Sequence, residues 1–170
     1  MAILPILIYG APELRKKARP VTAVDGAVQR LIDDMVETMC AAPGVGLAAN
    51  QVGVLQRIIV MNPTEQQDPE GLIAIINPEI VLAEGEAVGE EGCLSIPDVR
   101  DEVTRYRRVV VKGIGRDEKP LELEATDLPS RALQHEIDHL DGVLFVDRLS
   151  PAKKTLLRRQ LKKRFLDKQD

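Results

Sequence analysis

The two histidines of the chain belong to one short stretch, QHEIDH, at residues 134–139. On a helix, residues four apart lie on the same face one turn apart, so His135 and His139 can bind one metal ion together. Glu136 lies beside them and offers a carboxylate for proton transfer. Two surface histidines on an amphipathic helix would give the same pattern, so the rest of the chain must decide between these interpretations.

A catalytic metal site needs a third protein ligand and an open position for water. Cys93 is the candidate, because it stands beside Gly92 in a turn that ends at Pro97. We interpret the other cysteine, Cys40, as a buried thiol at the end of a helix, where free cysteines commonly pack. No CxxC pair is present, so a Cys-His-His site fits better than a closed structural one. Such a site indicates metal-assisted hydrolysis of an amide or ester.

The composition limits the class of protein. The 170 residues suit one domain, and 44% hydrophobic and 29% charged residues are ordinary for a globular chain. With no Trp, two Phe and two Tyr, the core is expected to be aliphatic, and stacking platforms for single-stranded nucleic acid are not expected. The first residues do not have the pattern expected of a signal peptide, and no run of about 20 apolar residues is present. We therefore expect a cytoplasmic protein with reduced cysteines and neither a membrane nor DNA as partner.

The elements predicted to position these residues are a helix, then several extended segments, then further helices. A helix is predicted over 25–42, with Asp25 as N-cap. A second helix over 127–141 carries both histidines. Extended segments are predicted at 57–61, 72–76, 79–89 with bends at Gly85 and Gly89, 103–114 as one strand, and 121–125 at an edge. Residues 91–97 are expected to form a compact turn. This order of elements predicts an α+β fold.

Three segments together resemble the signature motifs of peptide deformylase: GVGLAANQ (44–51), EGCLSIP (91–97) and QHEIDHLDG (134–142). The first alone also fits a tight turn before a strand. The resemblance covers essentially the whole chain. It implies short mixed or antiparallel sheets around a central HExxH helix, with an N-terminal and a C-terminal helix. It also implies an enzyme of the bacterial cytosol that removes formyl from the N-terminal formyl-methionine of new polypeptides, releasing formate.

The resemblance also assigns roles to residues. The implied metal ligands are Cys93, His135 and His139, with water as the fourth. Glu136 is implied as general base and then acid, while the Gln51 side-chain amide and the Leu94 backbone N–H stabilise an oxyanion. The substrate peptide and its methionine side chain are expected to contact Val45, Gly46, Glu91, Gly92, Leu128 and Ala132. Extended peptide substrates commonly add to a strand in this way.

The ligand types do not fix the metal. Softness and geometry make Zn²⁺ the default for a Cys-His-His set. The family characteristically uses Fe²⁺, with Ni²⁺ or Co²⁺ as active substitutes, so we expect one Fe²⁺ per chain. Two residues depart from the pattern: Arg131 stands where an apolar pocket residue is expected, and Gly89 is unusually small. Asp138 is either an ordinary surface charge or a partner of Arg105.

The last twenty residues differ in charge from the rest. Residues 151–170 carry eight Lys or Arg and two Asp, whereas residues 1–150 carry 15 basic and 25 acidic residues. Ser150 as N-cap and Pro151 predict the start of a basic amphipathic helix. We expect residues 1–150 to form the catalytic domain and 151–170 to be a helix appended to it. The helix either packs on the body with its charges in water or contacts a polyanion, and the resemblance suggests the ribosome.

Two other functions compete with the deformylase hypothesis. A metallopeptidase of the HExxH type would cut peptide bonds, and a ribosome-associated module could bind metal without catalysis. The Cys93 ligand and the Gln51 motif favour the deformylase over the peptidase. The presence of Glu136 and an open coordination position argues against the non-catalytic module.

Overall fold

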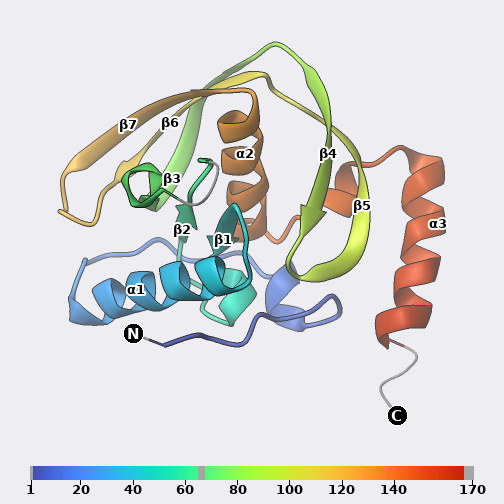
Figure 1. Ribbon diagram of the computed structural model, residues 1–170, viewed down its shortest axis with the longest axis horizontal. Coiled ribbons are helices and arrows are strands. Elements are labelled where there is room, and N and C mark those ends of the chain that lie inside the picture. The colour runs from blue at the N-terminus through green and yellow to red at the C-terminus, as the bar shows by residue number, and fades with distance from the viewer. Residues whose placement is uncertain (1, 65–67, 167–170) are drawn as a thin grey trace.

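The computed structural model describes residues 2–64 and 68–166, and this part of the chain forms an α+β fold with two antiparallel sheets (Figure 1). Its α-helices are α1 (Gly26–Ala41), α2 (Leu128–Leu140) and α3 (Pro151–Leu161). Its strands are β1 (Gly46–Ala48), β2 (Ile58–Met61), β3 (Ile73–Glu84), β4 (Ala87–Cys93), β5 (Ile96–Arg105), β6 (Arg108–Ile114) and β7 (Pro120–Thr126). The predicted fold class is confirmed.

The larger sheet, of order β1-β2-β3-β6-β7, is covered by a helix on each face. Its strand β2 reads IIVM and is buried throughout, as a strand between two apolar layers must be. Ile58 and Val60 pack with α1, while Ile59 and Met61 pack with α2 on the other face. The sheet therefore fixes α2, and with it the histidines, against a dry apolar surface.

Helix α1 agrees with the predicted range 25–42 to within one residue at each end. The Asp25 side chain accepts a hydrogen bond from the Val28 N–H at 3.0 Å, which caps the helix as predicted. The buried face includes Ile32, Met35 and Met39. Cys40, by contrast, is exposed, so its prediction as a buried thiol is wrong. It follows Met39 on the helix and falls beside the apolar stripe rather than on it.

Strands β4 and β5 form a separate two-stranded hairpin, and two predictions are corrected here. Gly89 is no bend, because it lies inside β4 opposite Val103. The compact turn predicted over 91–97 is confined to Leu94 and Ser95, because β4 continues to Cys93 and pairs with Ile96. The bend predicted at Gly85 is confirmed, and its φ of 71° is a conformation that favours glycine.

The predicted strand over 103–114 is also broken in two, at Tyr106. Its backbone N–H donates to the Gln134 side chain at 3.0 Å, and its carbonyl accepts from the Gln134 amide at 2.8 Å. The Ser130 hydroxyl donates to the same carbonyl at 2.9 Å. Side chains of α2 thus replace ladder hydrogen bonds at this point, where the chain passes from the β4–β5 hairpin into β6 of the larger sheet.

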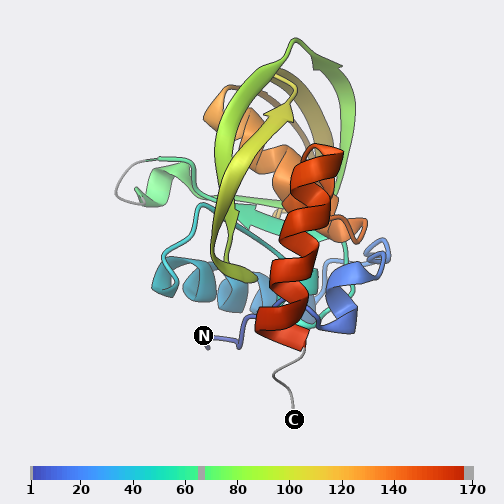
Figure 2. The same ribbon diagram turned by 90° about the vertical axis from the view of Figure 1, so that its right-hand side faces the viewer.

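Helix α3 packs lengthwise against the outside of the β4–β5 hairpin (Figure 2). The Ser150 hydroxyl caps it, and Leu161 is buried against a cluster that includes Ile96 and Phe145. The helix packs on the body, which is the first of the two alternatives considered, and the chain continues as a π-helical turn over Lys162–Leu166. The predicted segment 167–170 lies outside the described residues. Among the described helices, none has the length and apolar character that crossing a bilayer would require.

Candidate active site

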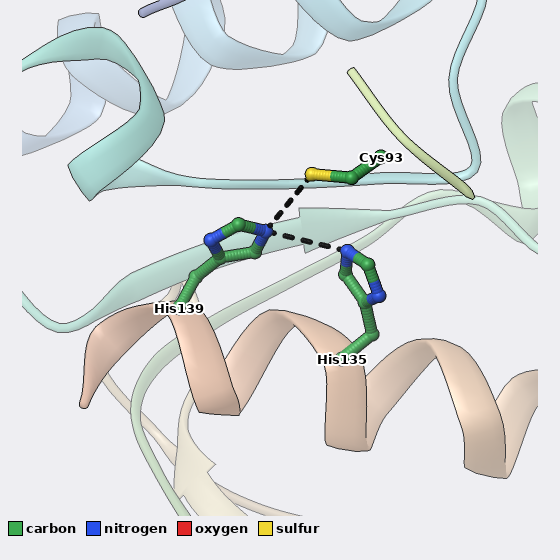
Figure 3. Close-up of side chains that lie close together, drawn as sticks. All are labelled: Cys93, His135 and His139. Carbon is green, nitrogen blue, oxygen red and sulfur yellow. Dashed lines mark hydrogen bonds between the residues drawn. The ribbon is translucent and has the colours of Figure 1, made fainter. Parts of the chain in front are cut away.

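Cys93, His135 and His139 meet at one point between the hairpin and α2 (Figure 3). The His139 Nε2 atom lies 3.3 Å from the Cys93 Sγ atom and 3.3 Å from the His135 Nε2 atom. The three candidate ligand atoms all lie within 4.8 Å of one another. The i, i+4 spacing on α2 and the end of β4 together produce this cluster.

This geometry fits a divalent metal ion. Nitrogen and sulfur ligands at 2.0–2.3 Å around a tetrahedral ion lie about 3.3–3.6 Å apart. His139 Nε2 lies at this spacing from both Cys93 Sγ and His135 Nε2. Burial, together with the charges of His135 and Arg105, holds the pKa of His139 well below its ordinary value. The His139 ring is therefore neutral at physiological pH and can offer a lone pair to a metal.

The ring of His135 is oriented by Glu91. The His135 Nδ1 atom lies 2.9 Å from Glu91 Oε1, so that Nε2 faces Cys93 and His139. Burial raises the pKa of Glu91, but hydrogen bonds from Arg105 and His135 hold it well below its ordinary value. Glu91 is thus an ionised carboxylate that holds the orientation of the His135 ring, as carboxylates commonly do behind metal-bound histidines.

Glu136 is buried next to these ligands. It is 5% exposed, and its Oε1 atom has no hydrogen-bond partner among the described residues. A Cβ atom added to Gly46 would lie 2.5 Å from Glu136 Oε2, so only glycine leaves room for the carboxylate. Burial raises the pKa of Glu136 to about 7, against the opposing charge of His135. A carboxyl with this pKa can both accept and return a proton near neutral pH.

Gln51 directs its side-chain amide at the same cluster. Its Nε2 atom donates to the Ser95 hydroxyl oxygen at 3.1 Å and lies 3.7 Å from Cys93 Sγ. Its Oε1 atom accepts from the Ala48 N–H at 3.0 Å, which fixes which end of the amide faces the cysteine. The amide N–H group is therefore preorganised beside the metal-type cluster.

A cleft of about 790 Å³ opens onto this cluster, and it is lined by all but one of the predicted site residues. The exception is His139, which is 1% exposed. The residues lining the cleft include Val45, Gly46, Gln51, Glu91, Gly92, Cys93, Leu94, Leu128, Ala132, His135 and Glu136. Residues separated by up to 91 positions are thus brought together around one cleft, as the resemblance implied.

Sequence reasoning missed part of the charge network behind the cleft. Of the two interpretations for Asp138, the structure supports the pairing, because Arg105 Nη1 lies 2.6 Å from Asp138 Oδ2. Arg148, which was not singled out, binds both oxygens of Asp138 at 2.6 and 2.7 Å. Arg131 was noted only as a misfit, yet it lines the cleft. No spacing rule links these residues, since their partners are distant in the chain.

Comparisons with known proteins agree with this geometry. The family model described as polypeptide deformylase matches residues 3–155. A peptide deformylase of Thermodesulfovibrio yellowstonii is 51% identical over 162 residues, covering 95% of this chain and 98% of that protein. One from Syntrophobacter fumaroxidans is 52% identical over 164 residues, covering 96% of each.

Solved structures give the same result. A peptide deformylase from Legionella pneumophila is 46% identical and superposes with a TM-score of 0.88, covering 99% of this chain and 100% of that one. The enzyme from Ehrlichia chaffeensis in complex with actinonin is 37% identical with a TM-score of 0.89, covering 98% and 99%. From its fold, its cleft and these relatives, the chain belongs to the peptide deformylase family, the metal-dependent enzymes that remove the N-formyl group from nascent polypeptides.

Proposed function

We propose that Cys93, His135 and His139 hold one catalytic metal ion, and that Glu136 moves the protons of deformylation. The observation that carries this proposal is the convergence of the three ligand atoms within 4.8 Å of one another, beside the buried Glu136 carboxylate. A metal in such a set acts as a Lewis acid and supplies a hydrolytic nucleophile at neutral pH. Family membership favours this reaction over an HExxH peptidase or a non-catalytic module.

Groups of the chain itself are proposed to transfer the proton and to stabilise the negative charge that develops on the formyl oxygen. Glu136 accepts a proton from the attacking water and returns it to the amino nitrogen of methionine as the C–N bond breaks, which leaves formate and a free N-terminus. The Gln51 amide and the Leu94 N–H donate to the oxygen of the formyl group as negative charge develops there. The Gln51 geometry described above supports its part in this step.

The cleft walls are proposed to hold the formyl-methionyl peptide. Gly46 and Gly92 flank the cluster at strand positions, where an extended substrate can approach the backbone closely. Val45 and Leu128 are 44% and 51% exposed, so they offer apolar surface to the methionine side chain. Ala132 and Glu91 complete this pocket from α2 and β4.

Replacing Glu136 with alanine should lower the rate of formate release from formyl-Met-Ala-Ser by about 10²–10⁴-fold, because the proton acceptor is lost. The matched control is Glu122→Ala, which removes an exposed glutamate of β7 and should leave the rate unchanged. Formate is measured directly, and cleavage of the peptide bonds is followed in parallel. Undiminished formate release by the Glu136→Ala protein would refute the proposed proton transfer.

We further propose Fe²⁺ as the resident metal. The ligand set itself admits Zn²⁺, Ni²⁺ or Co²⁺, and the family resemblance is what favours iron. A ferrous site with a thiolate ligand is vulnerable to oxygen, since the cysteine can be oxidised. The free cysteine ligand also supports a reducing compartment, the bacterial cytosol.

Protein purified in air should lose iron and activity together, whereas anaerobic purification should retain both. Metal content by mass spectrometry and formate release are measured on the same samples. Cobalt or nickel added to the air-exposed protein should restore activity where Cys93 is still a thiol. Full activity in air with zinc alone at one ion per chain would show that the iron assignment is wrong.

The basic face formed by α3 and the π-helical turn after it is proposed to contact the ribosome. We treat residues 1–150 as the catalytic domain and 151–170 as its appended helix. Lys153 and Arg164 pair with Asp101 and Asp98 of the hairpin. A further group of basic side chains is exposed without an ion pair among the described residues: Arg158, Arg159, Lys162 and Lys163. Such a face can approach a polyanion while Leu161 stays buried.

Neutralising this face should weaken co-sedimentation with ribosomes about tenfold at low salt, since phosphate contacts are lost. The substituted residues are Arg158, Arg159, Lys162 and Lys163, each changed to Gln. Deleting the helix would be a poorer test because it removes Leu161 from the core. The control neutralises four exposed basic residues of the body: Lys16, Lys17, Arg30 and Lys112. Equal co-sedimentation of both variants and the unaltered protein would rule out this contact.

A further inference from the structure

Arg131 links α2 by hydrogen bonds to both strands of the β4–β5 hairpin. Its Nη1 atom donates to Glu91 Oε2 at 2.7 Å and to the Val103 carbonyl at 2.8 Å. Its Nη2 atom donates to the Ala87 carbonyl at 2.8 Å. Arg131 precedes His135 by one helical turn and points to the same side of α2. One guanidinium therefore joins the helix that carries the histidines to the hairpin that carries Cys93.

The contact with Glu91 matters because this carboxylate also orients His135. Oε1 of Glu91 accepts from His135 Nδ1 and from Arg105 Nη2, each at 2.9 Å. Oε2 accepts from Arg105 Nε at 2.8 Å and from Arg131 Nη1 at 2.7 Å. The two oxygens belong to one rigid plane, so loss of the Arg131 donor leaves Oε2 held by Arg105 alone and loosens the carboxylate that accepts from the His135 ring.

The Arg131 guanidinium lies against Gly89, where the absence of a side chain leaves room for it. Gly89 lies within β4, with ordinary extended backbone, so no turn requires glycine there. A Cβ atom added to Gly89 would lie 3.1 Å from the Cζ, Nε and Nη2 atoms of Arg131. A branched side chain at this position would force the guanidinium away from the Ala87 carbonyl. The two departures from the expected pocket, Gly89 and Arg131, are therefore two halves of one arrangement.

We propose that Arg131 is a positioning residue that holds Glu91, and through it the His135 ring, in the geometry needed for metal binding, and that Gly89 is required because it leaves room for this guanidinium. The inference rests on the proposed ligand set of Cys93, His135 and His139. It concerns the affinity of that set for metal, and it assigns Arg131 no contact with the reacting atoms.

The first measurement is metal affinity, with Co²⁺ as probe and a chelator as competitor. Arg131→Met and Gly89→Val should each weaken Co²⁺ binding about tenfold, at the low end of the loss seen when groups behind metal ligands are altered. Arg131→Lys should lie between Arg131→Met and the unaltered protein. The matched control is Arg108→Met, which removes an arginine that joins Glu84 and Glu124 away from the cleft and should change nothing.

The double variant Gly89→Val/Arg131→Met tests the pairing. If Gly89 acts only by making room for Arg131, the double variant should bind Co²⁺ no more weakly than Arg131→Met alone. Losses that add in the double variant would overturn the role given to Gly89. Unchanged Co²⁺ affinity in Arg131→Met and Gly89→Val, even with a lowered unfolding temperature, would show a merely structural role and overturn the proposal.

A second measurement needs no metal. With only two histidines in the chain, ¹⁵N-histidine NMR of the metal-free protein resolves each ring nitrogen. The His135 Nδ1–H proton should be protected from exchange in the unaltered protein and exchange faster in both single variants. Equal exchange rates would overturn the proposal. If the unaltered protein binds Co²⁺ without a thiolate band that Cys93→Ala removes, the ligand set fails instead, and this NMR comparison still decides whether Arg131 positions His135.

Discussion

The site depends on one buried carboxylate. Glu91 is 5% exposed and accepts four hydrogen bonds, from two arginines and the His135 ring. Burying an ionised carboxylate costs several kcal/mol unless its lone pairs are satisfied by well-placed donors. Because Arg105 donates through two of its nitrogens, the pair is also directional. Glu91 therefore joins β4, β5 and α2 at the position where a metal ligand must be oriented.

The charge network continues away from the cleft. Arg105 also binds Asp138, and Asp138 in turn binds Arg148, which precedes α3 by a few residues. The side chains of Arg105 and Asp138 are 3% and 13% exposed, and each has a second ionic partner, Glu91 for Arg105 and Arg148 for Asp138. The network connects the ring of His135 to the segment leading into the C-terminal helix. The apolar packing of α2 on β2 supplies the rigid support that such a network needs.

The sequence allowed the main elements and the ligand set to be predicted where the cause is local. Asp25 caps α1 because its side chain reaches the backbone three residues on, and the i, i+4 histidines share a face of α2. The strand break at Tyr106 could not be predicted, since it depends on Gln134 of a distant helix taking over the backbone hydrogen bonds. Gly89 was interpreted as a bend for the same reason: its need for glycine comes from Arg131, 42 residues away.

X-ray absorption spectroscopy of the zinc-loaded protein tests the central claim most directly, because it reports the ligand atoms whatever the native metal. The account predicts one sulfur at about 2.3 Å and two imidazole nitrogens at about 2.0–2.1 Å, with a light atom in the open position. The sulfur should vanish in Cys93→Ala and remain in Cys40→Ala. A shell without sulfur in the unaltered protein, or a sulfur that survives Cys93→Ala, would contradict the account.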